Sequence, residues 1–251
     1  MGQSKTKLHI ITCGLDNSGK SSIINRLKPT ALQSEHISAT VGYNVEVFEK
    51  GSAKFTVFDM GGAKKFRGLW ETYYENINGI IFVVDSSDEL RLCVVKEEIE
   101  LMLQHPDIAR ELPKTNGAKI PFLFYANKMD LPNAKTAAEL VDLLDLTTLM
   151  ADRPFNIFAS NALKGTGVNE GFFWLQNTLL RQSNTISSSS SSRGGRGRGT
   201  DAIEFIYLFI FLLLSLLFLH SFIHRSNKIV SVTQLTPFAP VCLSMCVLRS
   251  A

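Results

Sequence analysis

The chain has 251 residues, 45% of them hydrophobic, and its formal net charge is +3. The excess of Lys and Arg lies beyond Ser183, so residues 1–182 are nearly neutral and we expect no nucleic-acid partner. No cleavable signal peptide is recognised, and the four cysteines lack metal-site spacing, which favours a reducing, cytosolic location.

Residues 1–182 alternate apolar runs with charged stretches, as globular α/β domains do. Short apolar runs predict strands, and helical spacing predicts helices between them. In chain order we expect strand Leu8–Cys13, helix Gly19–Leu27, a hairpin of Asn44–Glu49 and Lys54–Asp59, helix Phe66–Glu75, strand Gly79–Val84, helix Asp88–Gln104 with Asp88 as its N-cap, strand Phe122–Ala126, helix Thr136–Leu144, strand Phe155–Ala159 and helix Val168–Arg181. This order indicates a mostly parallel sheet with helices on both faces, whose ligands bind at the carboxyl ends of the strands.

The first polar motif follows the first strand and fits G-x-x-x-x-G-K-[ST]. Its backbone N–H groups and the start of the next helix are suited to bind phosphate oxygens. Lys20 would reach the β- and γ-phosphates, and Ser21 would give its hydroxyl to Mg²⁺. The expected phosphate-binding residues are Gly14, Leu15, Asp16, Asn17, Ser18, Gly19, Lys20, Ser21 and Ser22.

Three further residues are expected around the phosphates and the metal. Asp59 ends a strand and would hold Mg²⁺, while the backbone N–H of Gly62 would face the γ-phosphate. Thr40 would complete the metal shell with its hydroxyl when a γ-phosphate is present. The predicted metal ligands are therefore Ser21, Thr40 and Asp59.

The segment Asn127–Asp130 follows another strand and indicates a preference for guanine. Asp130 would accept hydrogen bonds from the N1–H and the exocyclic amine, a donor pair that adenine lacks. Asn127 would join this loop to the phosphate loop, and the stem of Lys128 would lie over the base. After the next strand, Ala159-Ser160 would offer the Ala159 N–H to guanine O6.

Across about residues 8–181 the sequence resembles the Arf-family small GTPases. The strings that carry the resemblance are GLDNSGKS at 14–21, TVGYNVE at 40–46, FTVFDMGG at 55–62, LWETYY at 69–74, FVVDSSD at 82–88 and NKMDL at 127–131. Several other strings are most similar to the ciliary Arf-like branch that recruits the BBSome coat, namely QHPDI at 104–108, ASNALKGTG at 159–167 and EGFFWLQ at 170–176.

The resemblance implies a Ras-like P-loop GTPase fold with a six-stranded, mostly parallel sheet. It implies a switch between GDP and GTP, with Mg²⁺, that is cytosolic with GDP and acts on the cytoplasmic face of membranes, at the cilium or flagellum. Expected partners are an exchange factor, an activating protein and a BBSome-like effector coat. The effector would meet Tyr43, Phe58 and Tyr73, although Phe58 also fits an ordinary core aromatic. The family's catalytic Gln is replaced by Ala63, so we expect slow hydrolysis.

The two ends carry additional signals. Met1–Thr6 fits the N-myristoylation pattern with Gly2 as acceptor. Residues 183–202 form a Ser/Gly/Arg-rich linker, residues 203–225 are apolar and long enough to span a bilayer, and residues 226–251 are expected to be disordered. The apolar stretch has two interpretations, a membrane anchor or the translation of non-coding sequence.

Two rival functions remain open. The chain could be a nucleotide-binding adaptor that never hydrolyses GTP, or a resident membrane subunit anchored by the apolar stretch. The Asn127–Asp130 segment argues against a P-loop kinase or an ATPase.

Overall fold

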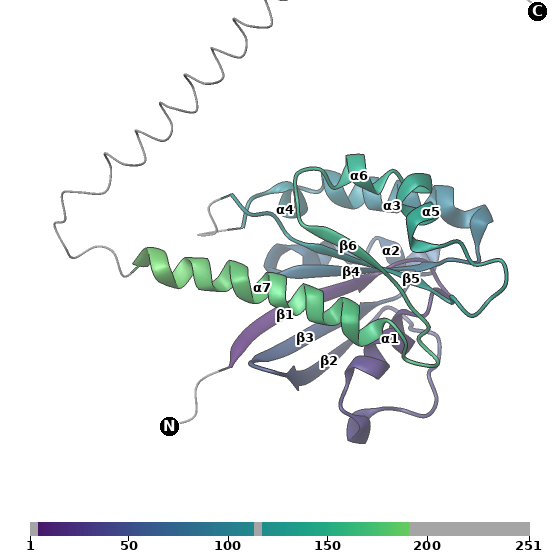
Figure 1. The fold of residues 1–251 in the computed structure, drawn as a ribbon, viewed down its shortest axis with the longest axis horizontal. Helices are drawn as coiled ribbons and strands as arrows, with labels where there is room; N and C mark the ends of the chain where they lie inside the picture. Colours follow the sequence, from purple (N-terminus) through teal and green to yellow (C-terminus); the bar gives the residue numbers. More distant parts are fainter. Residues whose placement is uncertain (1–4, 113–116, 191–251) are drawn as a thin grey trace, which may run out of the picture. The chain divides into compact units, whose positions relative to one another are not determined.

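The computed structural model describes residues 5–112 and 117–190 (Figure 1). Its centre is a six-stranded sheet in the order β2-β3-β1-β4-β5-β6. Only β2 and β3 are antiparallel among the neighbouring strands, so the predicted mostly parallel sheet is confirmed. The strands are β1 (Thr6–Cys13), β2 (Tyr43–Lys50), β3 (Ala53–Met60), β4 (Gly79–Asp85), β5 (Phe122–Asn127) and β6 (Phe155–Ala159).

Helices cover both faces of the sheet (Figure 1). One face packs against α1 (Lys20–Leu27) and α7 (Val168–Ser190). The other face packs against α3 (Leu92–Gln104), α4 (Pro106–Ala109), α5 (Ala137–Leu143), α6 (Leu146–Leu149) and the 3-10 helix η2 (Trp70–Asn76). The remaining short elements are η1 (Thr30–Leu32), α2 (Lys64–Arg67) and η3 (Glu89–Arg91).

The central strands are apolar on both faces because each face is covered. In β4, Phe82 and Val84 belong to one core cluster, and Ile81 and Val83 belong to the other. Side chains alternate between the faces of a strand, so a doubly covered strand has an unbroken apolar sequence. This arrangement explains why the apolar runs were sufficient to predict the parallel strands.

The prediction of one helix over Phe66–Glu75 is wrong, because two short elements occupy this segment. Helix α2 ends at Arg67, Gly68 follows, and η2 begins at Trp70. The Trp70 indole N–H donates to the Gly61 carbonyl at 3.0 Å, which holds this segment against the end of β3. Gly68 is a poor helix former, so a tertiary hydrogen bond and a local weakness both favour the break.

Two helix ends also differ from the predictions. Asp88 does not cap α3, which begins at Leu92, because its carboxylate instead pairs with Arg91 at 2.5 Å. Helix α7 continues past Arg181 to Ser190. Within it, the Ser183 hydroxyl donates to the Leu180 carbonyl at 2.8 Å, and no Gly or Pro occurs between Arg181 and Gly194 to end the helix.

Several predicted features lie outside the described residues. These are Gly2 with its myristoylation pattern, residues 191–202 of the predicted linker, the apolar stretch 203–225 and the tail 226–251. Within residues 5–112 and 117–190, no helix combines the length and the apolar character needed to cross a membrane.

Candidate functional site

The predicted phosphate loop lies between the end of β1 and the start of α1. Gly19 has φ +94°, and a Cβ there would come within 2.3 Å of the Asn127 side-chain nitrogen. Only glycine is suited to this left-handed backbone and close approach. The loop is thus placed at the carboxyl end of a central strand, directly beside the Asn127 loop.

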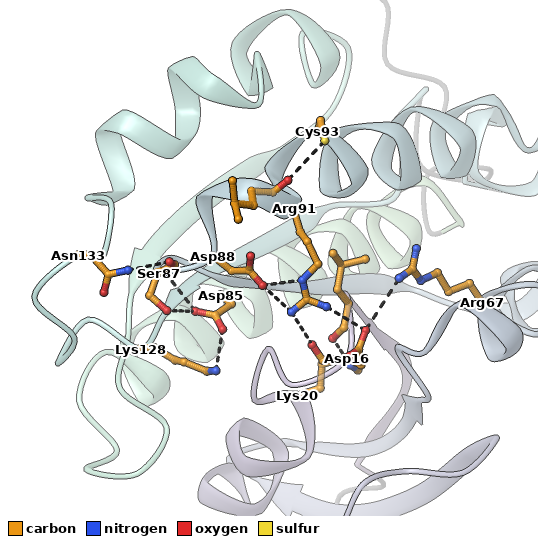
Figure 2. Close-up of polar contacts among 12 residues, drawn as sticks. Asp16, Lys20, Arg67, Asp85, Ser87, Asp88, Arg91, Cys93, Lys128 and Asn133 are labelled. Carbon is orange, nitrogen blue, oxygen red and sulfur yellow. Dashed lines mark hydrogen bonds and ion pairs between the residues drawn. The ribbon is translucent and has the colours of Figure 1, made fainter.

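An arginine near the start of α3 ties the phosphate loop to the rest of the domain (Figure 2). The Asp16 carboxylate lies 3.1 Å from the Arg91 guanidinium and 4.0 Å from that of Arg67. Arg91 also pairs with Asp88. Arg91 also donates to the Asp16 carbonyl at 3.4 Å, so the Asp16 side chain and carbonyl both bind a neighbouring element, and its backbone N–H would face the phosphates.

The phosphate loop borders a cavity of about 420 Å³. Lys20 is buried beside it, and its ammonium donates to the Leu15 carbonyl at 2.8 Å. Burial lowers the pKa of Lys20 and the Asp59 carboxylate opposes this effect, so this charge is poorly solvated and suited to bind an anion. The predicted residues on the cavity wall are Asp16, Asn17, Gly19, Lys20, Ser21, Ser22, Thr40, Gly62 and Ala63.

The three predicted metal ligands meet at this cavity. The Ser21 hydroxyl lies 2.5 Å from an Asp59 carboxylate oxygen and 2.9 Å from the Thr40 hydroxyl. Asp59 is 3% exposed, burial raises its pKa, and its Oδ1 has no hydrogen-bond partner among the described residues. Two hydroxyls and a partly unsatisfied carboxylate are oxygen ligands of the kind that Mg²⁺ binds, so these residues fit the metal.

Gly62 places the segment after β3 against the phosphate loop. A Cβ at Gly62 would lie 2.3 Å from the Leu15 carbonyl carbon, so no other residue fits without movement. Its own carbonyl accepts a hydrogen bond from Arg67 at 2.9 Å, and Arg67 pairs with Glu98 of α3 at 2.9 Å. The segment is thereby held from both sides.

A second cavity, of about 340 Å³, adjoins the first and shares Asn17, Gly19 and Ser22 with it. The Asn127 amide donates to the Ser18 carbonyl at 2.8 Å, which joins the two loops as the sequence predicted. The other residues on its wall are Asn127, Lys128, Asp130, Leu131, Asn161, Ala162 and Leu163.

The structure does not place Ala159 or Ser160 on this wall. Ala159 ends β6 in register with Ala126, and the Ser160 N–H continues the ladder by donating to the Ala126 carbonyl at 2.8 Å. The loop therefore opens two residues later than we predicted, and Asn161, Ala162 and Leu163 line the cavity instead. No signal in the sequence marks that the Ser160 N–H extends the sheet beyond Ala159.

One charged contact at this cavity was not predicted. The Lys128 ammonium lies 2.6 Å from the carboxylate of Asp85, the last residue of β4 (Figure 2). Burial raises the pKa of Asp85, but hydrogen bonds from Lys128 and Ser87 outweigh burial and hold the pKa below its ordinary value. The sequence did point to polar residues at strand ends, which is the signal that could have identified Asp85.

The sequence matches the ADP-ribosylation factor (Arf) family over residues 1–179. The chain belongs to the Arf family. It is 46% identical over 179 residues to ADP-ribosylation factor-like protein 6 of Danio rerio, covering 71% of this chain and 92% of that protein. It is 37% identical over 187 residues to the Caenorhabditis briggsae protein of the same name, covering 74% of this chain and 94% of that protein.

A solved structure agrees with the sequence comparison. The Arl6 BBS3 small GTPase from Trypanosoma brucei, determined with the nucleotide analogue GppNp, is 71% identical and superposes with a TM-score of 0.67. The match covers 70% of this chain and 99% of that structure. The chain is accordingly an Arf-like small GTPase of Ras-like fold, from a family that binds guanine nucleotide and hydrolyses GTP.

The aromatic residues expected to meet effectors of this Arf-family chain do form a cluster. The ring centroid of Tyr73 lies 4.9 Å from that of Tyr43 and 5.0 Å from that of Phe58. Tyr43 is 45% exposed, whereas Phe58 is partly buried and packs against the core. Phe58 thus supports the core and the surface cluster together.

A third hollow of the Arf domain, about 550 Å³, lies between the segment after α1 and the β2–β3 turn. It is larger than either cavity described above, but Lys5, Leu32, Glu49 and their neighbours on its wall belong to none of the predicted nucleotide-binding motifs. Most of the predicted nucleotide-binding residues instead line the two smaller, adjoining cavities.

Proposed function

We propose that this Arf-family chain is a Mg²⁺-dependent GDP/GTP switch. Its two switch segments, one around Thr40 and one around Gly62, are held together at the phosphate loop in the GTP state. The observation that carries the proposal is the meeting of Ser21, Thr40 and Asp59 within hydrogen-bond distance. The γ-phosphate would hold Thr40 and the Gly62 backbone, and hydrolysis would release both segments.

Each cavity has a separate task in this proposal. In the cavity beside the phosphate loop, the larger of the two adjoining cavities, the Lys20 ammonium and the loop N–H groups bind the phosphates. Bound Mg²⁺ would neutralise charge on the β- and γ-phosphate oxygens. In the smaller cavity, Asp130 accepts hydrogen bonds from the guanine N1–H and amine. Ala162 lines this cavity, and its N–H, which donates to the Asn127 side-chain oxygen at 3.0 Å, takes the place of the Ala159 N–H beside guanine O6 in this proposal.

Hydrolysis is slow in this proposal because Ala63 lines the phosphate cavity where the family carries a glutamine. A methyl group cannot orient the attacking water. Lys64 and Lys65 are exposed and do not line the cavity, so neither is placed to compensate. An activating protein would then supply the missing group, and an exchange factor would reload GTP.

The cellular role follows from the surface cluster and the relatives. Tyr43 lies against Tyr73, and Val41 and Val45, two residues to either side of Tyr43 in the chain, are exposed, which gives this region an apolar surface. We assign this surface to a BBSome-like coat in ciliary or flagellar trafficking, which the name Arl6 BBS3 of the trypanosome relative supports. A myristoyl group on Gly2 would bring the GTP form to the membrane, and a second signal would be needed because one acyl chain binds only marginally.

The test uses the full chain loaded with GppNp or GDP and immobilised, with a purified BBSome-like coat as the ligand. We expect retention of the coat by the GppNp form alone. Tyr73→Ala should abolish this retention, whereas the matched control Phe173→Ala, which removes a 63% exposed aromatic on α7, should not. Equal retention in both nucleotide states would reject the recruitment role.

The two rival functions have their own tests. Single-turnover hydrolysis of preloaded GTP distinguishes a slow GTPase from an adaptor that never turns over. Carbonate extraction of the full chain distinguishes a lipid-recruited switch, which is released, from a resident subunit anchored by residues 203–225, which is not.

A further inference from the structure

A mostly buried ion pair adjoins the smaller cavity, and one of its two members, Asp85, is not part of the predicted nucleotide site. It joins Asp85 to Lys128, whose side chains are 9% and 24% exposed, at 2.6 Å. The second Asp85 oxygen accepts from both the Ser87 hydroxyl, at 2.6 Å, and the Ser87 N–H, at 3.1 Å. Both oxygens of the Asp85 carboxylate thus have a partner inside the domain.

The position of Asp85 is set by the sheet. Asp85 ends β4 in register with Asn127 of β5, which directly precedes Lys128. The next residues extend this contact, because Ser86 donates its N–H to the Asn127 carbonyl at 3.0 Å and its carbonyl accepts from Lys135 at 2.8 Å. Asp85 is therefore held by the backbone on both sides of the loop that carries Lys128.

Lys128 needs such an anchor. Its backbone has φ +65°, a left-handed conformation that non-glycine residues adopt rarely. Its side chain has four rotatable bonds, so fixing the ammonium in one place costs rotamer entropy. The ion pair offsets this cost and directs the ammonium to Asp85 at the end of β4.

We propose that Asp85 is a positioning residue that fixes Lys128 on the wall of the base cavity and so sets how long guanine nucleotide stays bound. The proposal rests on the assignment of that cavity to guanine. Asp85 lines neither cavity itself, so it acts through Lys128. Its effect is the same for GDP and GTP because both carry the same base, and it does not reach the phosphate chemistry.

The test measures dissociation of fluorescent mant-GDP and mant-GppNp from the full chain in Mg²⁺. Asp85→Asn should accelerate both by about tenfold, a value at the low end for loss of one charge-assisted hydrogen bond. Lys128→Met keeps the aliphatic stem but lacks the ammonium, so it should produce a similar acceleration. The double variant should dissociate nucleotide no faster than Lys128→Met.

The control removes an equivalent charge elsewhere. Asp152 pairs with Lys119 before the start of β6, at the opposite end of the strands, so Asp152→Asn should leave dissociation unchanged. The single-turnover hydrolysis rate of bound GTP should also stay unchanged in Asp85→Asn, which a general loosening of the domain would not allow.

Three outcomes would overturn the proposal. These are unchanged dissociation in Asp85→Asn, unchanged dissociation in Lys128→Met, and an equal additional acceleration by Asp85→Asn in the Lys128→Met background. If Asp85→Asn does not fold by circular dichroism, Lys128→Met alone decides. A wild-type chain that binds no mant-GDP would instead reject the proposed function.

Discussion

Replacing Ala63 with glutamine should accelerate GTP hydrolysis by about one to three decades, because the family's water-orienting amide is then restored. Ala63 is half-buried at the N-cap of α2 and lines the 420 Å³ phosphate cavity. The added side chain therefore begins on the cavity wall, where an attacking water would approach the γ-phosphate. Each decade corresponds to about 1.4 kcal/mol of activation free energy.

The backbone around residue 63 should tolerate this substitution. Its neighbour Gly62 is held by the 2.9 Å hydrogen bond from Arg67, which does not involve the Ala63 side chain. Ala63 has an extended backbone with φ −63° and ψ 142°, which any residue adopts. A change in rate would therefore report on the side chain and not on a displaced segment.

The assay is single-turnover hydrolysis of GTP preloaded on the full chain in Mg²⁺. Ala63→Leu, of similar size but without an amide, serves as the control and should not accelerate the reaction. Lys64→Ala tests whether an exposed lysine already compensates, and it should leave the rate unchanged. An unchanged rate in Ala63→Gln would refute the argument, and a slower rate in Lys64→Ala would identify the compensating group.

The remaining predictions concern the base, the switch, the metal and the lipid. Asp130→Asn should shift preference from guanine toward xanthine nucleotides, measured by competition, and an unchanged margin for GTP would contradict the assignment of Asp130. Gly62→Ala should weaken GppNp binding relative to GDP by at least about tenfold, since its Cβ would lie 2.3 Å from the Leu15 backbone. Equal affinities would show that this close approach is not needed in the GTP state. Chelation of Mg²⁺ with EDTA should speed mant-GDP release. An unchanged release rate would contradict the assignment of Ser21 and Asp59 as metal ligands. Gly2→Ala should make a fragment of residues 1–190 fully soluble in flotation with vesicles, and undiminished flotation would mean that the lipid is not its anchor.

Much of this protein was predictable from the sequence alone, because its binding elements are local. A phosphate loop is a continuous segment whose glycines, lysine and serine act through their spacing on one turn. The doubly covered strands β1, β4 and β5 are apolar on both faces and were predicted from their continuous apolar runs. The family, the nucleotide and most candidate contacts followed from these segments.

Only the tertiary structure decided how distant segments meet. Residues 21, 40 and 59 are far apart in the chain, and their convergence depends on the packing of α1, β3 and the segment between them. The Trp70 hydrogen bond to Gly61 broke a helix that local spacing favoured, and one additional ladder bond from Ser160 placed Asn161–Leu163, not Ala159, on the wall of the second cavity. The Asp85–Lys128 pair likewise depends on the register of β4 with β5, a long-range pairing that no local pattern specifies.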